Sequence, residues 1–257
     1  MTPQKQFIAF YTMVRGDFMR IVRIWSQTLL PPVITTSLYF VVFGTFIGSQ
    51  LDAIQGLTYI QFIVPGLIMM SVITSSYMNT VSTFYFAKWT KTLDEVLVSP
   101  MPEWLVILGF VSGGVMRGLM VGVLVGIVGL FFTHLAIQNI LVLIAALVLT
   151  SVLFSIAGLI NGVFAKGFDG ISIVPTFVLT PLTYLGGIFY SIEQFPPFWQ
   201  TVSLFNPILY MVNAFRWGFF GVSDINIVVC FGVLGGFILA FLIILLWLFR
   251  RGIGVKN

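Results

Sequence analysis

Apolar residues fill six long runs along the chain, and polar residues gather in the short segments between them. A helix needs about 20 apolar residues to cross the hydrocarbon core of a bilayer, and each run has about that length. The pattern predicts an all-α polytopic membrane protein with one membrane domain, residues 1–257, and six transmembrane helices. The runs cover residues 29–47, 60–84, 105–132, 140–164, 171–190 and 227–249.

A further apolar segment, residues 195–217, is nearly long enough to make a seventh span. It also carries three prolines and Arg216. Each interior proline costs a helix about 3 kcal/mol unless its neighbours compensate, so the segment is broken into short pieces. We predict a re-entrant helical pair over residues 191–220 that enters and leaves the membrane on the outer side. An ordinary loop on the membrane surface is the alternative.

The basic residues support six spans rather than seven. Positive charge is retained in the cytoplasm, and a seventh span would place the basic C-terminus outside. With six spans, only Arg216 lies on the outer side, and Arg117 lies within the third run. We therefore predict a multi-pass protein of the cytoplasmic (inner) membrane with both termini in the cytoplasm. The other ten basic residues fall on that side: Lys5, Arg15, Arg20, Arg23, Lys88, Lys91, Lys166, Arg250, Arg251 and Lys256.

Residues 5–27 form a separate amphipathic unit before the first span. Apolar side chains recur at helical spacing on one face, from Phe7 to Trp25, and Lys5, Arg20 and Arg23 project from the other. This pattern is typical of a helix that lies flat in the cytoplasmic interface and anchors the first span.

A second amphipathic segment, residues 88–101, is the longest internal cytoplasmic loop. Leu93, Val96 and Leu97 share one helical face, and the acidic residues that follow Leu93 point away from it. Such a helix, held between two spans, can be pushed as a rigid lever by a docked partner. An interfacial helix that contacts only lipid headgroups explains the pattern equally well.

Small and charged residues single out the second and third runs. Pro65 and Gly66 predict a kink in the second run, and the third carries a glycine at every fourth position from Gly114 to Gly126. A glycine face lets a neighbouring helix approach closely, whether from this chain or from a second copy. Arg117 lies midway along the third run, where an unpaired charge is costly. It must find carbonyls, water, lipid phosphate or substrate, and a structural and a functional role stay open.

Composition excludes several classes of protein. Hydrophobic residues make up 59% of the chain and charged residues 8%, against about 25% charged in a soluble domain. The net charge of +4 comes from basic residues at the ends of apolar runs, so membrane orientation explains it and a nucleic-acid partner is not expected. Because the protein is expected to lie in a membrane, we expect membrane lipid to be one of its partners.

The sequence contains no recognisable catalytic arrangement. One histidine and one cysteine cannot form a metal cluster, so no metal site is expected, and no phosphate-binding loop for ATP is present. We predict no enzymatic activity and no cofactor in this chain. An ATPase-independent channel or secondary carrier is the alternative to a driven transporter, although buried carboxylates are lacking. A membrane enzyme acting on lipid-linked substrates is a third reading.

Three segments resemble the permease subunits of type-2 ABC exporters. QFIVPGLIMM, residues 61–70, is similar to the Pro-Gly motif of the family's second span. TKTLDEVLVSPM, residues 90–101, resembles its first coupling helix. The long stretch from PLTYLGGIFY to AFRWGFFG, residues 181–221, is similar to the signature that joins spans five and six. Together they extend the resemblance over essentially the whole chain, nearest to the polysaccharide, nodulation-type lipo-oligosaccharide and drug export branches.

The resemblance implies a function that periodicity does not reveal. Two permease copies would work with separate ATP-binding cassette ATPase subunits, which bind ATP and Mg, to move a lipid-linked glycan, lipid or drug. Residues 88–101 and the loop 165–170 would receive the ATPase stroke. The residues implied in ATPase coupling are Thr92, Leu93, Asp94, Glu95, Leu97, Lys166 and Asp169. The resemblance also implies that Pro65, Pro175 and Pro181 flank the translocation path. Arg117 and the outer aromatic residues are further candidates for the path or its gate: Tyr190, Phe195, Phe198 and Trp199.

The predicted topology can be tested with reporters at the C-terminus. A reporter fluorescent only in the cytoplasm is expected to be bright when fused after Asn257, and a phosphatase active only outside the cytoplasm is expected to be silent there. The opposite pattern would mean that residues 195–217 cross the membrane.

Overall fold

The computed structural model of the chain describes residues 2–50 and 53–254, and the regular structure in these two stretches is helical. The loop at Asp52 and the charge of Lys256 lie outside the described residues. The all-α prediction is confirmed for the described part of the chain. The main helices are α1 (Pro3–Arg23), α2 (Trp25–Thr28), α3 (Leu30–Tyr39), α4 (Tyr59–Trp89), α5 (Thr92–Val98), α6 (Glu103–Phe132), α7 (Ile140–Phe164), α8 (Phe168–Val174), α9 (Thr180–Tyr184), α10 (Pro197–Leu204), α11 (Pro207–Phe220) and α12 (Ile227–Arg251).

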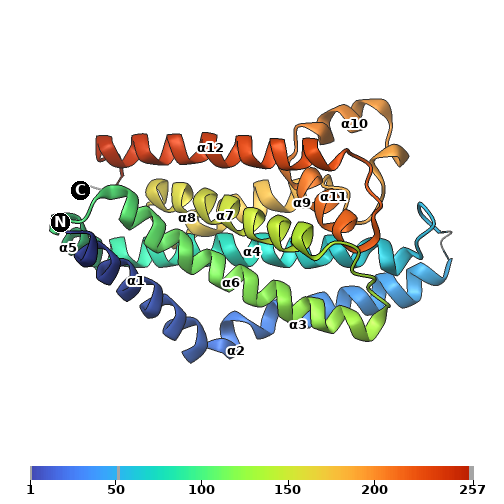
Figure 1. Cartoon of the computed structure of the whole chain (residues 1–257), viewed down its shortest axis with the longest axis horizontal. Coiled ribbons are helices and arrows are strands. Elements are labelled where there is room, and N and C mark those ends of the chain that lie inside the picture. Colours follow the sequence, from blue (N-terminus) through green and yellow to red (C-terminus); the bar gives the residue numbers. More distant parts are fainter. Residues whose placement is uncertain (1, 51–52, 255–257) are drawn as a thin grey trace.

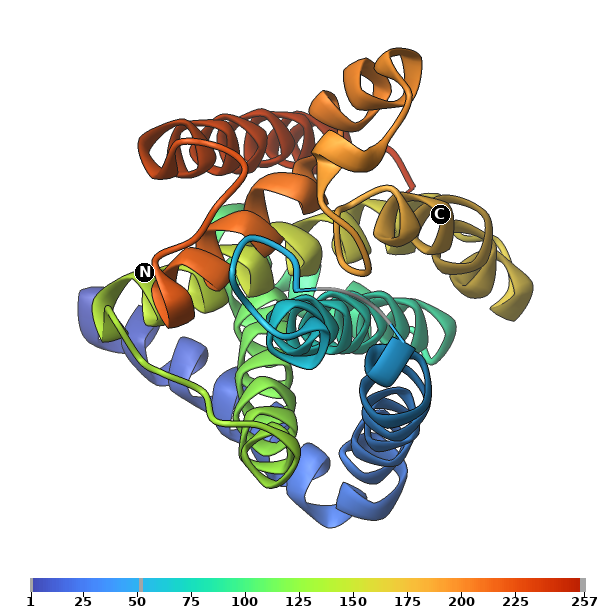
Figure 2. The same cartoon turned by 90° about the vertical axis from the view of Figure 1, so that its right-hand side faces the viewer.

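Helix α4 is the central element of the bundle. It packs against α6, α7 and α11, and Figure 2 shows it surrounded by the other long helices. The backbone N–H of Thr58 donates to the side chain of Gln61 at 3.0 Å, which caps its first turn. Most of its length is buried, and it runs through Pro65 without ending, because the surrounding helices compensate for the missing N–H.

Five helical segments of the described chain are long and apolar enough to cross a membrane. They are Trp25–Gly44, Tyr59–Trp89, Glu103–Phe132, Ile140–Phe164 and Ile227–Arg251. The predicted fifth span, residues 171–190, is shorter in the structure: α8, the π-helical turn η3 (Pro175–Leu179) and α9 form one stretch that ends at Tyr184. Gly187 follows that end and has a positive φ of 68°, a conformation that glycine adopts without strain. Whether the stretch from α8 to α9 crosses the membrane, and so brings the number of spans to six, stays a prediction.

The chain termini lie at one end of the bundle, which we call the terminal end (Figure 1). Helix α5 lies at the same end, and α10 lies at the opposite one. Helices α10 and α11 join the end of α9 to the start of α12. The end of α9 and the start of α12 both lie toward the end of the bundle that is away from the termini. This arrangement is compatible with a segment that enters and returns on one side.

Helix α1 runs obliquely across the outside of the bundle and packs against α6. It ends at Arg23, where Ile24 leaves helical geometry, so the predicted unit 5–27 is two helices, α1 and α2. Arg20 does not project into solvent as predicted. It turns toward α4, donates to Asn79 at 3.3 Å and pairs with Asp17 at 3.3 Å. Burial raises the pKa of Asp17, and the charge of Arg20 opposes that shift.

The glycine face of α6 packs against helices of the same chain. A side chain at Gly114 would meet Thr80, Ser155 and the backbone of Ser76, and one at Gly118 would meet Ser76 and Ser151. These contacts belong to α4 and α7. Gly126, at the end of the same row, has open space around it. The glycines therefore bring α6 into close contact with α4 and α7 over most of the row.

This packing predicts opposite results at the two ends of the glycine row. Gly114→Val places methyl groups against the Ser76 backbone and is expected to lower the free energy of unfolding by about 1–3 kcal/mol. Gly126→Val, which shares the change in helix propensity but not the clash, is the matched control. Thermal unfolding of the purified proteins in detergent measures both, and equal stabilities would contradict the packing.

Candidate functional site

The predicted coupling segment 88–101 is not one helix. Helix α4 continues to Trp89, the backbone turns at Lys91 with φ of 60°, and α5 occupies only Thr92–Val98. The left-handed turn at Lys91 separates the two helices, and Pro100 follows the end of α5. Because of this turn, α5 projects from the end of the central helix.

The two faces of α5 are as predicted. Asp94 and Glu95 are exposed, and Val96 and Leu97 pack against the core. Leu93 is only 1% exposed and belongs to the core. The implied contact between Leu93 and a partner stays a prediction, and the burial of this side chain leaves little of its surface for such a contact. Leu93 anchors α5 to the bundle.

The second implied coupling segment lies beside the end of α4. The ring of Phe168 packs edge-on against Tyr85, with centroids 5.2 Å apart, and against Trp89 at 6.0 Å. A cavity of about 350 Å³ separates the C-terminal turn of α4 from Lys166. The structure thus brings both segments against the C-terminal part of α4. Their exposed residues, which we call the coupling surface, are Thr92, Asp94, Glu95, Lys166 and Asp169.

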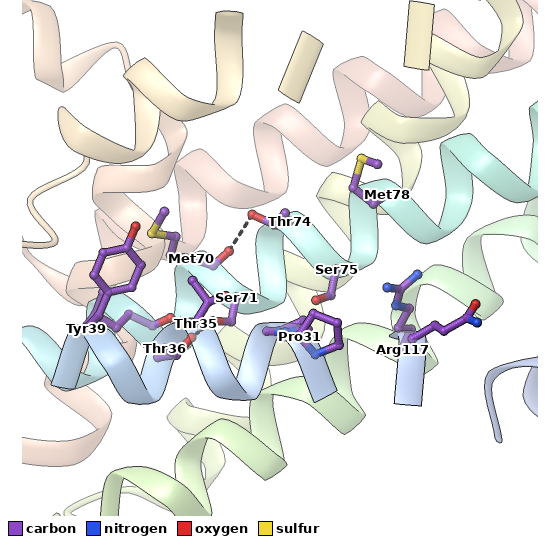
Figure 3. A pocket seen from close by; sticks show the side chains of 13 residues that line it. Pro31, Thr35, Thr36, Tyr39, Met70, Ser71, Thr74, Ser75, Met78 and Arg117 are labelled. Carbon is purple, nitrogen blue, oxygen red and sulfur yellow. Dashed lines mark hydrogen bonds between the residues drawn. The ribbon is translucent and has the colours of Figure 1, made fainter. Parts of the chain in front are cut away.

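A cavity of about 360 Å³ lies between α3 and α4 (Figure 3). Arg117 reaches one end of it from α6, and Tyr39 lies at the other. The guanidinium Nη2 of Arg117 donates to the carbonyl of Thr28 at 3.1 Å, so a carbonyl is one of the partners that the sequence required. The lining between these ends combines hydroxyl groups with methionines: Thr35, Thr36, Ser71, Thr74, Ser75, Met70 and Met78.

The other residues implied in the path do not line this cavity. Pro65 is buried in α4, where Gly66 allows the backbone of Ile188 to approach. In the α8–α9 stretch, Pro175 is half-buried and Pro181 is exposed. Tyr190 lines a separate cavity of about 620 Å³, at the opposite end from α5. Of the remaining aromatic residues, Phe195 packs edge-on against the Tyr190 ring at 4.5 Å, whereas α10 exposes Phe198 and Trp199.

Sequence reasoning missed the burial of Arg216. Its side chain is fully buried on α11, where its guanidinium lies 3.7 Å from the ring centroid of Phe62. It donates to the carbonyl of Gly187 at 2.7 Å and lies 3.8 Å from the carboxylate of Asp224. The sequence signal was an arginine in an apolar helix, with an aspartate eight positions later beyond Gly221.

Asp224 adds three further hydrogen bonds to this cluster. One carboxylate oxygen accepts from Ser191 at 2.7 Å and from Gln55 at 2.5 Å, and the backbone N–H of Asp224 donates to Asn213 at 2.8 Å. The pair of Arg216 and Asp224 therefore connects α4, the turn after α9, α11 and the loop before α12.

With this arrangement established, comparison with known proteins gives a consistent result. Residues 8–220, from α1 to the end of α11, match the ABC-2 type transporter family. The chain belongs to the ABC-2 type transporter family. It is 53% identical over 251 residues to the inner membrane transport permease YadH of Escherichia coli K12, covering 98% of each chain. It is 24% identical over 227 residues to nodulation protein J of Rhizobium leguminosarum bv. viciae, covering 87% of this chain and 85% of that one.

Membership of the ABC-2 family makes this chain the membrane subunit of a transporter, a multi-pass permease of the inner membrane. The family resemblance drawn from the sequence motifs is confirmed. In this ABC-2 permease the Pro-Gly motif and the signature of residues 181–221 meet in space, because Gly66 contacts Ile188 and Phe62 contacts Arg216.

The buried ion pair predicts a characteristic pattern of stability. Arg216→Met and Asp224→Asn each leave one buried charge without its partner, and each is expected to lower the free energy of unfolding by about 3–5 kcal/mol. The double variant removes both charges and is expected to lose less than the sum of the single losses. Denaturant unfolding in detergent measures the three variants, and strict additivity would show that the two charges do not interact.

Proposed function

We propose that this permease is the transmembrane subunit of an ATP-driven exporter that moves an amphiphilic substrate across the inner membrane. In this proposal it works as a homodimer with separate ATPase subunits, which hold the ATP and Mg. The terminal end of the bundle faces the cytoplasm, where both termini and α5 then lie. The positive-inside rule supports that orientation.

The observation that carries the proposal is the coupling surface. Two segments more than 60 residues apart, α5 and the loop 165–170 with the start of α8, both adjoin α4 and expose charged residues. Asp94 and Glu95 face outward, while Leu93 fixes α5 to the end of α4. A push on this surface would therefore reach the central helix directly. A helix that only contacted lipid headgroups would have no need of two outward acidic residues beside an anionic membrane surface.

The proposal treats the stretch from α8 to α9 as the fifth of six spans and residues 191–220 as the re-entrant segment. This stretch exposes Ile173, Phe177, Val178 and Pro181, and Phe177 is 73% exposed. A second copy of the chain covers this face in the proposed dimer. The cavity between α3 and α4 then lies on the path, because its mixture of hydroxyl groups and methionines suits an amphiphile.

Charge reversal on α5 tests the assignment. In Asp94→Lys and Glu95→Lys, a partner that recognises the acidic face is repelled, and copurification of the ATPase and its ATP turnover are both expected to fall about tenfold. In each variant, one lost charge contact and the repulsion of the new lysine, together about 1.4 kcal/mol, would produce a change of this size.

Glu193→Lys provides the matched control. Glu193 is exposed at the opposite end of the molecule, so its reversal changes the net charge equally without touching the coupling surface. Its complex is expected to retain the ATPase. Unchanged copurification and ATP turnover in the two α5 variants would refute the proposed docking surface.

A further inference from the structure

Arg117 lies at the junction of two cavities. One is the cavity of about 360 Å³ between α3 and α4, and the other, of about 120 Å³, lies between the α1–α2 segment and α4. The smaller cavity is also lined by Arg20, Asn79 and Thr83. The guanidinium thus faces space on two sides, although it belongs to the middle of a membrane-spanning helix.

The bonding capacity of Arg117 is largely unused. Nη2 donates to the carbonyl of Thr28, but Nε is buried without a hydrogen-bond partner. Within residues 2–50 and 53–254, no carboxylate lies within ion-pair distance of it. Burial of an unpaired charge in a bundle is costly, so an anion that reaches this point gains both a charge and free donors.

The neighbouring charges leave a net positive site. Arg20 pairs with Asp17 at 3.3 Å and also donates to Asn79, so the charge of Arg20 is compensated within α1. The positive charge of Arg117 remains. A further donor lines each cavity, because the Ser75 hydroxyl in the larger one and the Asn79 amide nitrogen in the smaller one are buried without hydrogen-bond partners.

The larger cavity combines fixed hydroxyl groups with a mainly apolar lining. Thr36 and Ser71 share a hydrogen bond of 2.7 Å, and Thr74 donates to the carbonyl of Met70 at 3.0 Å, so these hydroxyl groups line the wall in a fixed arrangement. Outside it, α3 exposes Ile34 and Leu38, which is 60% exposed. An apolar chain could lie along that surface while its polar end enters the cavity.

We propose that Arg117 binds the phosphate or carboxylate headgroup of an anionic amphiphile in the cavity between α3 and α4, with Ser75 as a supporting donor. This inference rests on the proposed export function only where it identifies the bound molecule as the cargo. The binding itself is a property of this chain alone and does not need the ATPase.

Binding of dihexanoyl phosphatidic acid to the purified full-length permease, in neutral detergent, tests the proposal. Arg117→Gln is expected to weaken this affinity about ten- to hundredfold, because a charge-assisted contact is lost. Arg15→Gln, which removes an exposed arginine of α1 away from both cavities, is expected to change it less than about twofold. Dihexanoyl phosphatidylcholine is expected to bind weakly and equally to all three proteins.

Two further arms keep the result decisive. Thr74→Trp fills the cavity and leaves Arg117 in place, so it is also expected to weaken phosphatidic acid binding, and it replaces Arg117→Gln if that variant fails to fold. Inorganic phosphate is expected to compete poorly, since it lacks the apolar chain. Equal affinity of Arg117→Gln and the native protein would overturn the site, and equal competition by inorganic phosphate would overturn the amphiphile.

These outcomes are separate from those of the α5 charge reversals. Loss of phosphatidic acid binding in Arg117→Gln with unchanged ATPase copurification in Asp94→Lys would retain the binding site and refute the docking surface. The reverse combination would retain the docking surface and refute the anionic cargo.

Discussion

The buried charge of Arg216 is the constraint on which the proline-broken part of the structure depends. A fully buried guanidinium is tolerated only when carbonyls, an aromatic face and a carboxylate surround it, and here each partner comes from a different segment. The Gly187 carbonyl fixes the turn after α9, Phe62 fixes α4, and Asp224 fixes the loop before α12. The segment between the last two long helices is therefore tied to the central helix rather than left as a surface loop.

Helix α4 joins this cluster to the opposite end of the molecule. Its 31 residues form one helix of about 45 Å, with Phe62 near one end and the turn into α5 at the other. Between them, Ser71, Thr74 and Ser75 line the cavity beside α3. In the proposed exporter, a force on α5 acts on the same rigid element that borders the cavity and holds the outer cluster. No flexible linker separates the three sites.

Patterns within single helices could be predicted from the sequence, and contacts between distant segments could not. The apolar runs predicted four of the long helices to within a few residues, and spacing alone assigned Leu93 and Asp94 to opposite faces of α5. The glycine row was expected to be a packing face, but its partners, α4 and α7, depend on tertiary structure. The predicted length of the fifth run was too great, because the helical stretch ends at Tyr184. Apolar residues continue through the turn at Gly187, so the hydrophobic pattern does not indicate where the backbone leaves the helix.

The two arginines in the apolar part of the chain illustrate why function needs the fold. By sequence, Arg117 and Arg216 are alike: each is a single charge among apolar residues of a helix. The structure separates them by their surroundings, since Arg216 is enclosed by a ring, a carbonyl and a carboxylate, whereas Arg117 has one carbonyl, an unpartnered Nε and cavities on two sides. Arg216 is fully buried beside a carboxylate of its own chain, so its charge is compensated within the protein. Arg117 has no such carboxylate and borders two cavities, and that difference makes Arg117 the functional candidate.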